Sequence, residues 1–359
     1  MPRELPSLAI GGRRVAEDVP PFVVAEIGLN HGGSLDRALA LVEGAARAGA
    51  QAIKLQTLVA RDLVSDGSPA PKHVKAASML EFFQRFELDE RAHRAIFDRA
   101  RTRKLKVVAT PLSERSVDML VRLGVDAFKI ASGDLTFDRL IVRCVQTNKP
   151  VVMSTGMATA DEVTRAVSVA RQAGAEQLAL LHCVSAYPVP RGNENLRAIR
   201  TLGEATGLPV GLSDHGEDAF ALPIAIALGA CIYERHIVLP GDEDAIDRDV
   251  SSTPEALAAA IEQARRAWTA LGSGQKACLT VEAPNRVPSR RSLFAAKDLP
   301  AGTIIRAEDF IALRPATGLA PATLATLVGR RLLRAVPQGQ ALTEAHCDVS
   351  GIPEHDRVA

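Results

Sequence analysis

Two histidines stand at the ends of consecutive apolar runs in this 359-residue chain. The run VGLSDH ends at His215, and the next, CIYERHI, contains His236. A lone histidine is more often a satisfied core or surface residue than a metal ligand. If the two runs are neighbouring strands that open on one face, however, their neutral imidazoles can share a divalent ion. Two protein ligands are too few for a structural zinc site, so the ion would keep positions for water and substrate oxygens. Manganese, magnesium, cobalt or a catalytic zinc fits that description.

Other apolar runs also end in polar residues, and two of these are lysines. Burying Lys54 and Lys129 without partners would cost several kcal/mol each, so they imply an anionic ligand or carboxylate partners. Hydroxyls beside two lysines suit a phosphate and a carboxylate bound together. Thr155, Asp214 and Glu234 could instead close turns or pair at the rim. The polar residues at the run ends are Glu26, Asn30, Lys54, Gln56, Thr110, Lys129, Ser132, Asp134, Ser154, Thr155, Ser185, Tyr187, Ser213, Asp214, His215, Glu234 and His236.

The elements that carry these residues repeat one unit: a short apolar run, a turn and a helical pattern. Continuous β-branched runs are typical of parallel strands buried on both faces. Eight strands alternating with eight helices over roughly 250 residues predict a (β/α)8 TIM barrel, an α/β fold whose chemistry lies at the carboxyl ends of the strands. An open doubly wound sheet is the alternative, but no GxGxxG follows the first run. The predicted strands are residues 22–28, 52–56, 107–112, 127–132, 150–155, 178–184, 210–215 and 231–237.

A change of texture after residue 272 predicts a second domain. The barrel is assigned residues 1–275, a linker rich in Gly, Pro, Ser and Arg residues 276–291, and a small β-rich domain residues 292–350. Within the last, LPAGTIIRAEDF (299–310) echoes VPQGQALTEAHC (336–347). Two such P-x-G turns around short strands indicate a compact module, too small to be a typical independent enzyme.

Composition excludes several classes of protein. Lys+Arg 43 against Asp+Glu 42 leaves a net charge of +1, and aromatic residues make up 4%, which argues against a nucleic-acid partner. No apolar run reaches the roughly 20 residues of a membrane span, and the first residues lack the apolar core of a signal peptide. Five scattered cysteines without a CxxC pair suit a reducing compartment. We therefore expect a soluble, cytoplasmic protein with no nucleic-acid or membrane partner.

The motifs resemble those of the sialic acid synthase family, in the same order and over about residues 20 to 349. The second domain resembles the antifreeze-like (SAF) domain that ends those synthases. The family condenses phosphoenolpyruvate with an N-acylated amino sugar to make nine-carbon 2-keto sugar acids. The barrel motifs that carry the resemblance are AEIGLNHGGSLDRAL, GAQAIKLQT, ATPLSERSVDML, KIASGD, STGM, HCVSAYP, GLSDH, ERH and DRDVSSTPEAL.

The resemblance implies a role for each matching position. His215 and His236 would bind the metal, Mn²⁺ in the first place with Mg²⁺ or Co²⁺ as alternatives, that polarises the aldehyde oxygen of the open-chain sugar. Arg314, in LRPATGLAP, would reach the acceptor's acyl group from the partner of a domain-swapped homodimer. Lys54, Thr110, Lys129, Ser132, Ser154 and Ser213 would hold phosphoenolpyruvate; Glu26, Gln56, Ser185, Tyr187 and Asp247 would position the sugar; Glu26, Lys54, Asp134 and Asp247 form the implied catalytic set.

Departures from the family pattern concern mainly the acceptor. Asp134 stands where the family usually has Glu, one methylene shorter, and Leu112 and Ser113 replace the Phe-Asp of ATPFD. LPGDEDAIDRD replaces a longer stretch after His236, and no counterpart of a Tyr-Gln pair is found near 70–76. Ser185 occupies a position that is Asn in some members. The phosphoenolpyruvate positions are intact, so we expect that donor, and an acceptor other than standard N-acetylmannosamine.

Two other functions remain open. One is a related barrel synthase that takes a phosphorylated or non-amino aldose, which would need a second basic cluster that the sequence does not reveal. The other is a catalytically silent barrel that serves as a sugar-binding scaffold. The retained lysines and histidines argue against silence, because a silent barrel has no reason to keep them buried.

Overall fold

The computed structural model describes residues 5–69 and 76–357, and the chain divides into two compact units, Met1–Ser273 and Gly274–Ala359. Among those residues, eight parallel strands of the first unit form a closed barrel in which each strand pairs with the next and β10 pairs with both β9 and β3. The predicted TIM barrel is confirmed. Its strands are β3 (Phe22–Gly28), β4 (Ala52–Thr57), β5 (Lys106–Pro111), β6 (Ala127–Ile130), β7 (Val151–Ser154), β8 (Leu178–Cys183), β9 (Val210–Asp214) and β10 (Ile232–Ile237).

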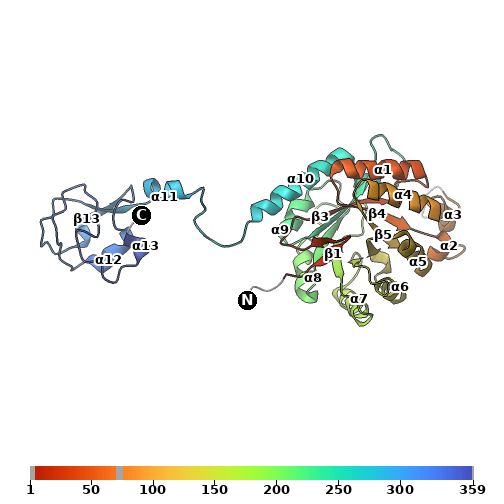
Figure 1. The fold of residues 1–359 in the computed structure, drawn as a ribbon, viewed down its shortest axis with the longest axis horizontal. Helices are drawn as coiled ribbons and strands as arrows, with labels where there is room; N and C mark the ends of the chain where they lie inside the picture. Colours follow the sequence, from red (N-terminus) through yellow and green to blue (C-terminus); the bar gives the residue numbers. More distant parts are fainter. Residues whose placement is uncertain (1–4, 70–75, 358–359) are drawn as a thin grey trace. The chain divides into compact units, whose positions relative to one another are not determined.

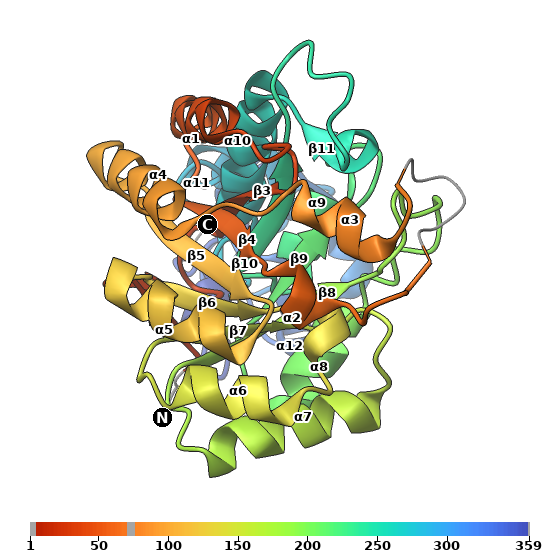
Figure 2. The same ribbon diagram turned by 90° about the vertical axis from the view of Figure 1, so that its right-hand side faces the viewer.

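Helices surround this barrel (Figures 1 and 2). Local signals explain their starts: the Ser34 side chain caps the first, and Thr159 with Glu162 forms a complete capping box. Two short helices precede the main helix in the long connection between the second and third barrel strands. The helices are α1 (Leu35–Ala48), α2 (Ala60–Leu63), α3 (Met79–Gln84), α4 (Glu90–Thr102), α5 (Glu114–Leu123), α6 (Asp138–Val145), α7 (Ala160–Gln172), α8 (Ala198–Thr206), α9 (Ala221–Ala227) and α10 (Pro254–Leu271), with 3-10 turns η1 (Ser132–Asp134) and η2 (Arg248–Val250) and a two-residue strand β11 (Ser251–Ser252) beside β10.

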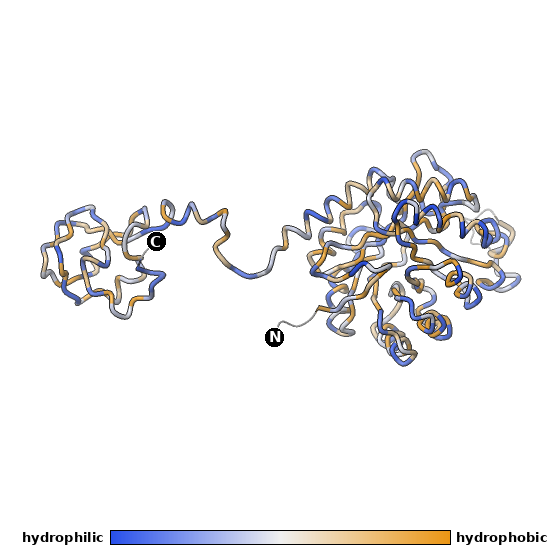
Figure 3. Tube along the Cα trace, in the orientation of Figure 1, coloured by the Kyte–Doolittle hydropathy of each residue, from blue (hydrophilic) through white to orange (hydrophobic). Residues whose placement is uncertain are grey.

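Two apolar layers hold the barrel together. One lies between the strands and the helices, and apolar colouring follows the central strands in Figure 3. The other fills the barrel interior at the amino ends of the strands. There a hairpin of β1 (Leu8–Ile10) and β2 (Arg13–Val15) packs Leu8, Ile10 and Val15 against Phe22 and Val24. The amino ends of the strands are therefore filled by apolar side chains, which leaves the carboxyl ends for polar ones.

The second unit contains a small antiparallel sheet and a core of its own. The two P-x-G segments pair with each other: Leu299 and Val336 exchange backbone hydrogen bonds of 2.9 and 2.8 Å. The stretch predicted as a linker includes a short helix, α11, whose Val287 carbonyl accepts a hydrogen bond from the Ala316 N–H. The elements are α11 (Ala283–Ser289), β12 (Ser292–Ala295), η3 (Ala307–Asp309), β13 (Phe310–Leu313), η4 (Pro321–Thr323), α12 (Leu324–Leu327) and α13 (Glu354–Arg357).

Across residues 5–69 and 76–357, no helix has both the length and the apolar character needed to cross a bilayer.

Candidate active site

Strand register brings charged residues together at the carboxyl end of the barrel. His236 on β10 is paired with Glu26 on β3, and Glu26 is paired in turn with Lys54 on β4. On the other side of β10, Glu234 is paired with Ser213 on β9. Because β9, β10, β3 and β4 are consecutive around the barrel, all five side chains belong to one half of its mouth.

A cavity of about 370 Å³ opens at this end of the barrel. Most of the predicted site residues line it, from seven of the eight strands and the loops that follow them. Leu112 and Met157 also contribute. The lining residues are Lys54, Gln56, Thr110, Leu112, Lys129, Ala131, Ser132, Gly133, Ser154, Met157, Cys183, Ser185, Tyr187, Ser213, His215, Glu234 and His236.

Lys54 lies between two buried carboxylates. Its Nζ is 2.5 Å from Glu26 Oε2 and 2.8 Å from Glu234 Oε1, and all three side chains are almost fully buried. Burial lowers the pKa of Lys54 to about 8, although the attraction of Glu234 opposes that shift. A buried lysine implies either an anionic ligand or carboxylate partners. For Lys54, the carboxylate partners are present within the chain.

Lys129 completes the charged group from the opposite side. Its Nζ donates to Ser154 Oγ at 2.5 Å and lies 3.8 Å from Glu234 Oε1, while Ser213 Oγ donates to that same carboxylate oxygen at 2.9 Å. Burial alone would raise the pKa of Glu234, but Lys129 and Lys54 outweigh it and lower the pKa to about 2. The two lysines, Lys54 and Lys129, and the two carboxylates, Glu26 and Glu234, together carry a net charge of zero. We call Glu26, Lys54, Lys129, Ser154, Ser213 and Glu234 the charged floor.

The two histidines adjoin the charged floor. Their ring centroids are 5.5 Å apart, and the Tyr187 ring stacks on His215 with centroids 4.2 Å apart. Burial, aided by His215 and Lys54, holds the pKa of His236 well below its usual range. For His215, burial lowers the pKa, but the Cys183 thiol, 3.7 Å from Nδ1, reverses the shift and raises it.

The two histidines fit one kind of metal site. The buried Nδ1 of His236 makes no hydrogen bond, although Asp247 Oδ2 lies 3.4 Å from it, and burial holds the pKa of His236 well below its usual range, which favours the neutral form that binds metal. Among the described residues, no three His, Cys, Asp or Glu side chains converge as a closed cage. The residues therefore fit an ion held by two imidazoles, with its other ligands drawn from water and substrate.

The upper wall of the cavity is more exposed than its floor. Tyr187 is 55% exposed and Met157 is 73% exposed, whereas Lys54 is 5% exposed. A Cβ on Gly156, next to Met157, would lie 2.2 Å from Ser185 Oγ, so a side chain at this position would require Ser185 to move. We call Gln56, Leu112, Met157, Ser185 and Tyr187 the rim.

Four predicted residues do not line the cavity. Glu26 is one of them, and its carboxylate contacts Lys54, which does line it. Asp134 follows Ser132 and Gly133 in η1, and its Oδ2 is buried without a hydrogen-bond partner; burial raises its pKa, partly opposed by Lys129. Asp247 lies behind His236, with Oδ2 3.4 Å from His236 Nδ1, and burial raises its pKa too. Arg314 is an exposed residue of the second unit. The segment without a Tyr-Gln pair falls mostly on residues 70–75, which lie outside the described ranges.

Two ionisable residues of the cavity lining, Glu234 and Cys183, were missing from the predicted site set. Glu234 was interpreted as a possible rim or turn residue, yet it contacts both lysines of the charged floor. The available signal was its spacing: Glu234 and His236 are two residues apart on one strand and so share a face. Cys183 lines the cavity beside His215. As a lone cysteine at a strand end, it gave no signal beyond its position.

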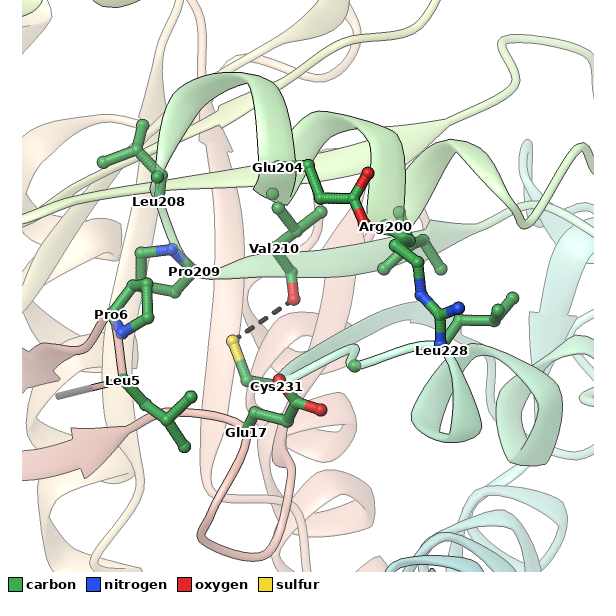
Figure 4. Close-up of a pocket in the computed structure, with 14 residues that line it drawn as sticks. Leu5, Pro6, Glu17, Arg200, Glu204, Leu208, Pro209, Val210, Leu228 and Cys231 are labelled. Carbon is green, nitrogen blue, oxygen red and sulfur yellow. Dashed lines mark hydrogen bonds between the residues drawn. The ribbon is translucent and has the colours of Figure 1, made fainter. Parts of the chain in front are cut away.

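A larger cavity, of about 460 Å³, lies at the opposite end of the barrel. Leu5, Pro6, Leu208 and Pro209 form one side of it in Figure 4. The Cys231 thiol donates to the Val210 carbonyl. Its position at the amino ends of β9 and β10 is the face where barrel residues usually serve stability rather than catalysis. The smaller cavity is therefore the candidate active site.

The closed barrel and the charged residues at its carboxyl end define a (β/α)8-barrel enzyme. Comparison with known proteins specifies the family. The chain belongs to the NeuB family, which matches residues 41–276, and a SAF domain matches residues 290–346. It is a transferase of the sialic acid synthase type, as the names of its relatives indicate.

Relatives from bacteria and animals align with nearly the whole chain. The N,N'-diacetyllegionaminic acid synthase of Legionella pneumophila is 34% identical, with 91% of this chain and 94% of the relative aligned. The human N-acetylneuraminate-9-phosphate synthase is 28% identical over 95% and 96%. The crystal structure of an N-acetylneuraminic acid synthetase from Leptospira borgpetersenii, in complex with citrate, superposes with a TM-score of 0.72 at 29% identity and covers 79% of this chain and 96% of that one.

Proposed function

We propose that the protein condenses phosphoenolpyruvate with an open-chain N-acylated amino sugar, giving a nine-carbon 2-keto-3-deoxy sugar acid and phosphate in a metal-dependent reaction. The observation that carries this proposal is the charged floor, where two buried lysines and two hydroxyls surround one end of a 370 Å³ cavity. Lysine ammonium groups and hydroxyls are donors suited to phosphate and carboxylate oxygens. The named activities of the relatives support the same reaction class.

The charge balance of the floor supports the metal requirement. Lys54 and Lys129 are already offset by Glu26 and Glu234, so a multiply charged anion such as phosphoenolpyruvate needs further positive charge. A divalent ion bound by His215 and His236 would supply that charge and polarise the aldehyde oxygen of the acceptor. Mn²⁺ is our first choice, with Mg²⁺ or Co²⁺ as alternatives.

The residues then have distinct tasks. Lys129 and Ser154 would bind the donor's anionic groups, with Thr110, Ser132 and Ser213 beside them, while Lys54 holds Glu26 and Glu234 in place. The donor's C3 forms a bond to the aldehyde carbon, and that carbonyl oxygen takes up a proton. Water adds at C2, the C2–O bond breaks, and phosphate leaves.

The acceptor is proposed to lie against the rim. Tyr187 and Gln56 present polar atoms there, and Leu112 gives an apolar contact where relatives are expected to have an aromatic residue. Leu112, Ser185 and the loop 240–247 all depart from the family pattern, so we propose a deoxygenated or diamino hexose rather than N-acetylmannosamine. All five cysteines are free thiols, which suits work in the cytoplasm.

The decisive experiment measures phosphate release from phosphoenolpyruvate with a panel of acceptors. The panel contains N-acetylmannosamine, its deoxygenated and diacetamido analogues, and a 6-phosphorylated hexosamine, each with Mn²⁺ and with EDTA. We expect release only with metal, and the highest kcat/KM with a diacetamido analogue. A preference for the phosphorylated sugar would indicate the alternative synthase class, and no release with any acceptor would indicate a silent scaffold. Full turnover in verified metal-free protein would refute the metal.

Arg314 is proposed to act across a homodimer. A domain of the second unit's size buries little core alone and gains stability by docking on another surface. An exposed guanidinium delivered to a partner's barrel would donate hydrogen bonds to the acceptor's acyl carbonyl. Arg314→Ala should raise the acceptor's KM with little change in KM for phosphoenolpyruvate. Mixing Arg314→Ala with His236→Ala subunits should restore part of the activity; no restoration after proven subunit exchange would contradict the proposal.

A further inference from the structure

The turn that follows β3 packs directly behind His236. Gly28 has a φ of +52°, and a Cβ on it would lie 3.0 Å from both Cε1 and Nδ1 of the His236 ring. The pairing between β3 and β4 also shifts register between Glu26 and Gly28, so the chain leaves the sheet at this point. Only glycine combines this conformation with so close an approach.

Asn30, two residues further on, is completely buried and uses its whole side-chain amide. Its Nδ2 donates to the Ile237 carbonyl and to Ser251 Oγ, each at 2.9 Å. Its Oδ1 accepts from the Asp247 N–H, also at 2.9 Å. Two donors and one acceptor are thus satisfied by two separate segments of the chain, β10 and residues 247–251, which fixes the orientation of the amide.

The partners of Asn30 are the neighbours of candidate site groups. Ile237 follows His236 on β10, and Ser251 Oγ itself donates to the Asp247 carbonyl at 2.6 Å. The Leu29 N–H, from the same turn, donates to the Asp247 carboxylate. Asp247 is therefore held at its N–H, carbonyl and carboxylate, with Oδ2 3.4 Å from His236 Nδ1.

We propose that Asn30 is a positioning residue that sets the Asp247 carboxylate against the His236 imidazole. Asn30 does not line the cavity, so it acts through these two groups and not on substrate. The consequence for turnover rests on the proposed function, whereas the consequence for the loop around Asp247 does not. Groups that orient a metal-binding histidine or its carboxylate neighbour commonly change metal affinity or activity by about 10- to 100-fold.

The test compares Asn30→Ala and Ser251→Ala with Thr206→Ala as matched control. Thr206 is also buried and donates one side-chain hydrogen bond, to the Leu202 carbonyl at 2.6 Å, but it lies at the end of α8. For Asn30→Ala we expect kcat to fall by about 10- to 100-fold while KM for phosphoenolpyruvate stays within twofold. Ser251→Ala should show a smaller loss because two Asn30 contacts remain. Thr206→Ala should lose stability without losing kcat.

Two readouts do not depend on turnover. Amide hydrogen exchange should rise at Asp247 in Asn30→Ala but not in Thr206→Ala, since that N–H loses its acceptor. Calorimetric Mn²⁺ binding should weaken by about tenfold or more in the same variant. If the wild-type protein neither binds Mn²⁺ nor releases phosphate, the proposed function fails, and faster exchange at Asp247 still supports the positioning role. Unchanged exchange at Asp247 together with unchanged kcat in folded Asn30→Ala would overturn it.

Discussion

The charged floor and the rim lie in one cavity but differ in how their polar atoms are satisfied. On the floor, the single carboxylate of Glu234 contacts Lys54, Lys129 and Ser213. Each of these side chains is at least about 90% buried. On the rim, Tyr187 contributes a half-exposed ring, and Met157 is mostly exposed. The floor is fixed by its internal partners, whereas the rim is open to change.

This difference explains where the sequence departs from its family. Altering a charged floor residue would leave a buried charge unpaired, which costs several kcal/mol, so the floor, where we propose that the donor binds, is hard to change. The most exposed rim residue, Met157, can change at a smaller cost in stability, because no buried charge depends on it. Acceptor choice can therefore diverge on an unchanged barrel.

The largest predicted effect is on the floor. Lys54→Met should lower the barrel's free energy of unfolding by about 3–5 kcal/mol, because Glu26 and Glu234 would be left buried without their shared cation. Urea denaturation followed by the fluorescence of Trp268, the one tryptophan of the chain, reports on the barrel. The control is Arg165→Met, which breaks an exposed pair with Asp138 and should cost less than about 1 kcal/mol. Equal losses in both variants would remove the distinction between floor and surface.

Acid pH should act outside the floor first. Burial, with smaller effects of His93 and Arg37, lowers the pKa of His31 from 6.5 to about 4. The unfolded chain therefore takes up a proton that the folded chain does not, and stability present above pH 6.5 is lost as pH falls toward 4, by about 3 kcal/mol from this residue. Glu234, with a pKa of about 2, stays ionised throughout this range.

The variant His31→Asn isolates that contribution. Its unfolding free energy should decline less than that of the wild-type protein between pH 6.5 and 4, whatever its stability at pH 7. Parallel urea curves at four or five pH values give the difference. Identical slopes for the two proteins would show that His31 does not carry the acid sensitivity.

The smallest predicted effect is on the rim. Tyr187→Ala should raise KM for the acceptor by about tenfold, equivalent to about 1.4 kcal/mol, and leave KM for phosphoenolpyruvate within twofold. Tyr187→Phe keeps the ring that stacks on His215 and should lie between this variant and the wild-type protein. Steady-state kinetics with both substrates varied measures the split. A matching rise in the donor's KM would mean that the floor and the rim are not separable.

Much of the architecture was predictable from the sequence because it depends on local and periodic signals. Continuous apolar runs predicted the strands, and Thr159 followed three residues later by Glu162 has the spacing of a capping box, which the structure contains. Strand-end position also identified most cavity-lining residues, since parallel strands deliver their ends to one face.

What could not be predicted depends on side-chain pairing across strands. The sequence left open whether Lys54 meets a ligand or a carboxylate, and the register that sets Glu26 and Glu234 around it appears only in the structure. The threefold use of Asn30 is equally invisible, because its partners are more than 200 residues away in the chain. Asp134 was assigned to the site by resemblance, and no pattern in the sequence indicates that it is absent from the cavity lining.

The pairing of β10 with β3 also has a consequence for how the protein is made. Phe22 pairs with Ile232, so the first barrel strand emerges long before the strand that covers its free edge. At roughly 5–20 residues per second, synthesis of the intervening segment takes on the order of 10–40 s. During that time the nascent chain exposes an apolar β3 edge able to pair with other chains. A ribosome-bound chain that stops before Ile232 should therefore depend on chaperones, and release from that dependence should coincide with the appearance of β10.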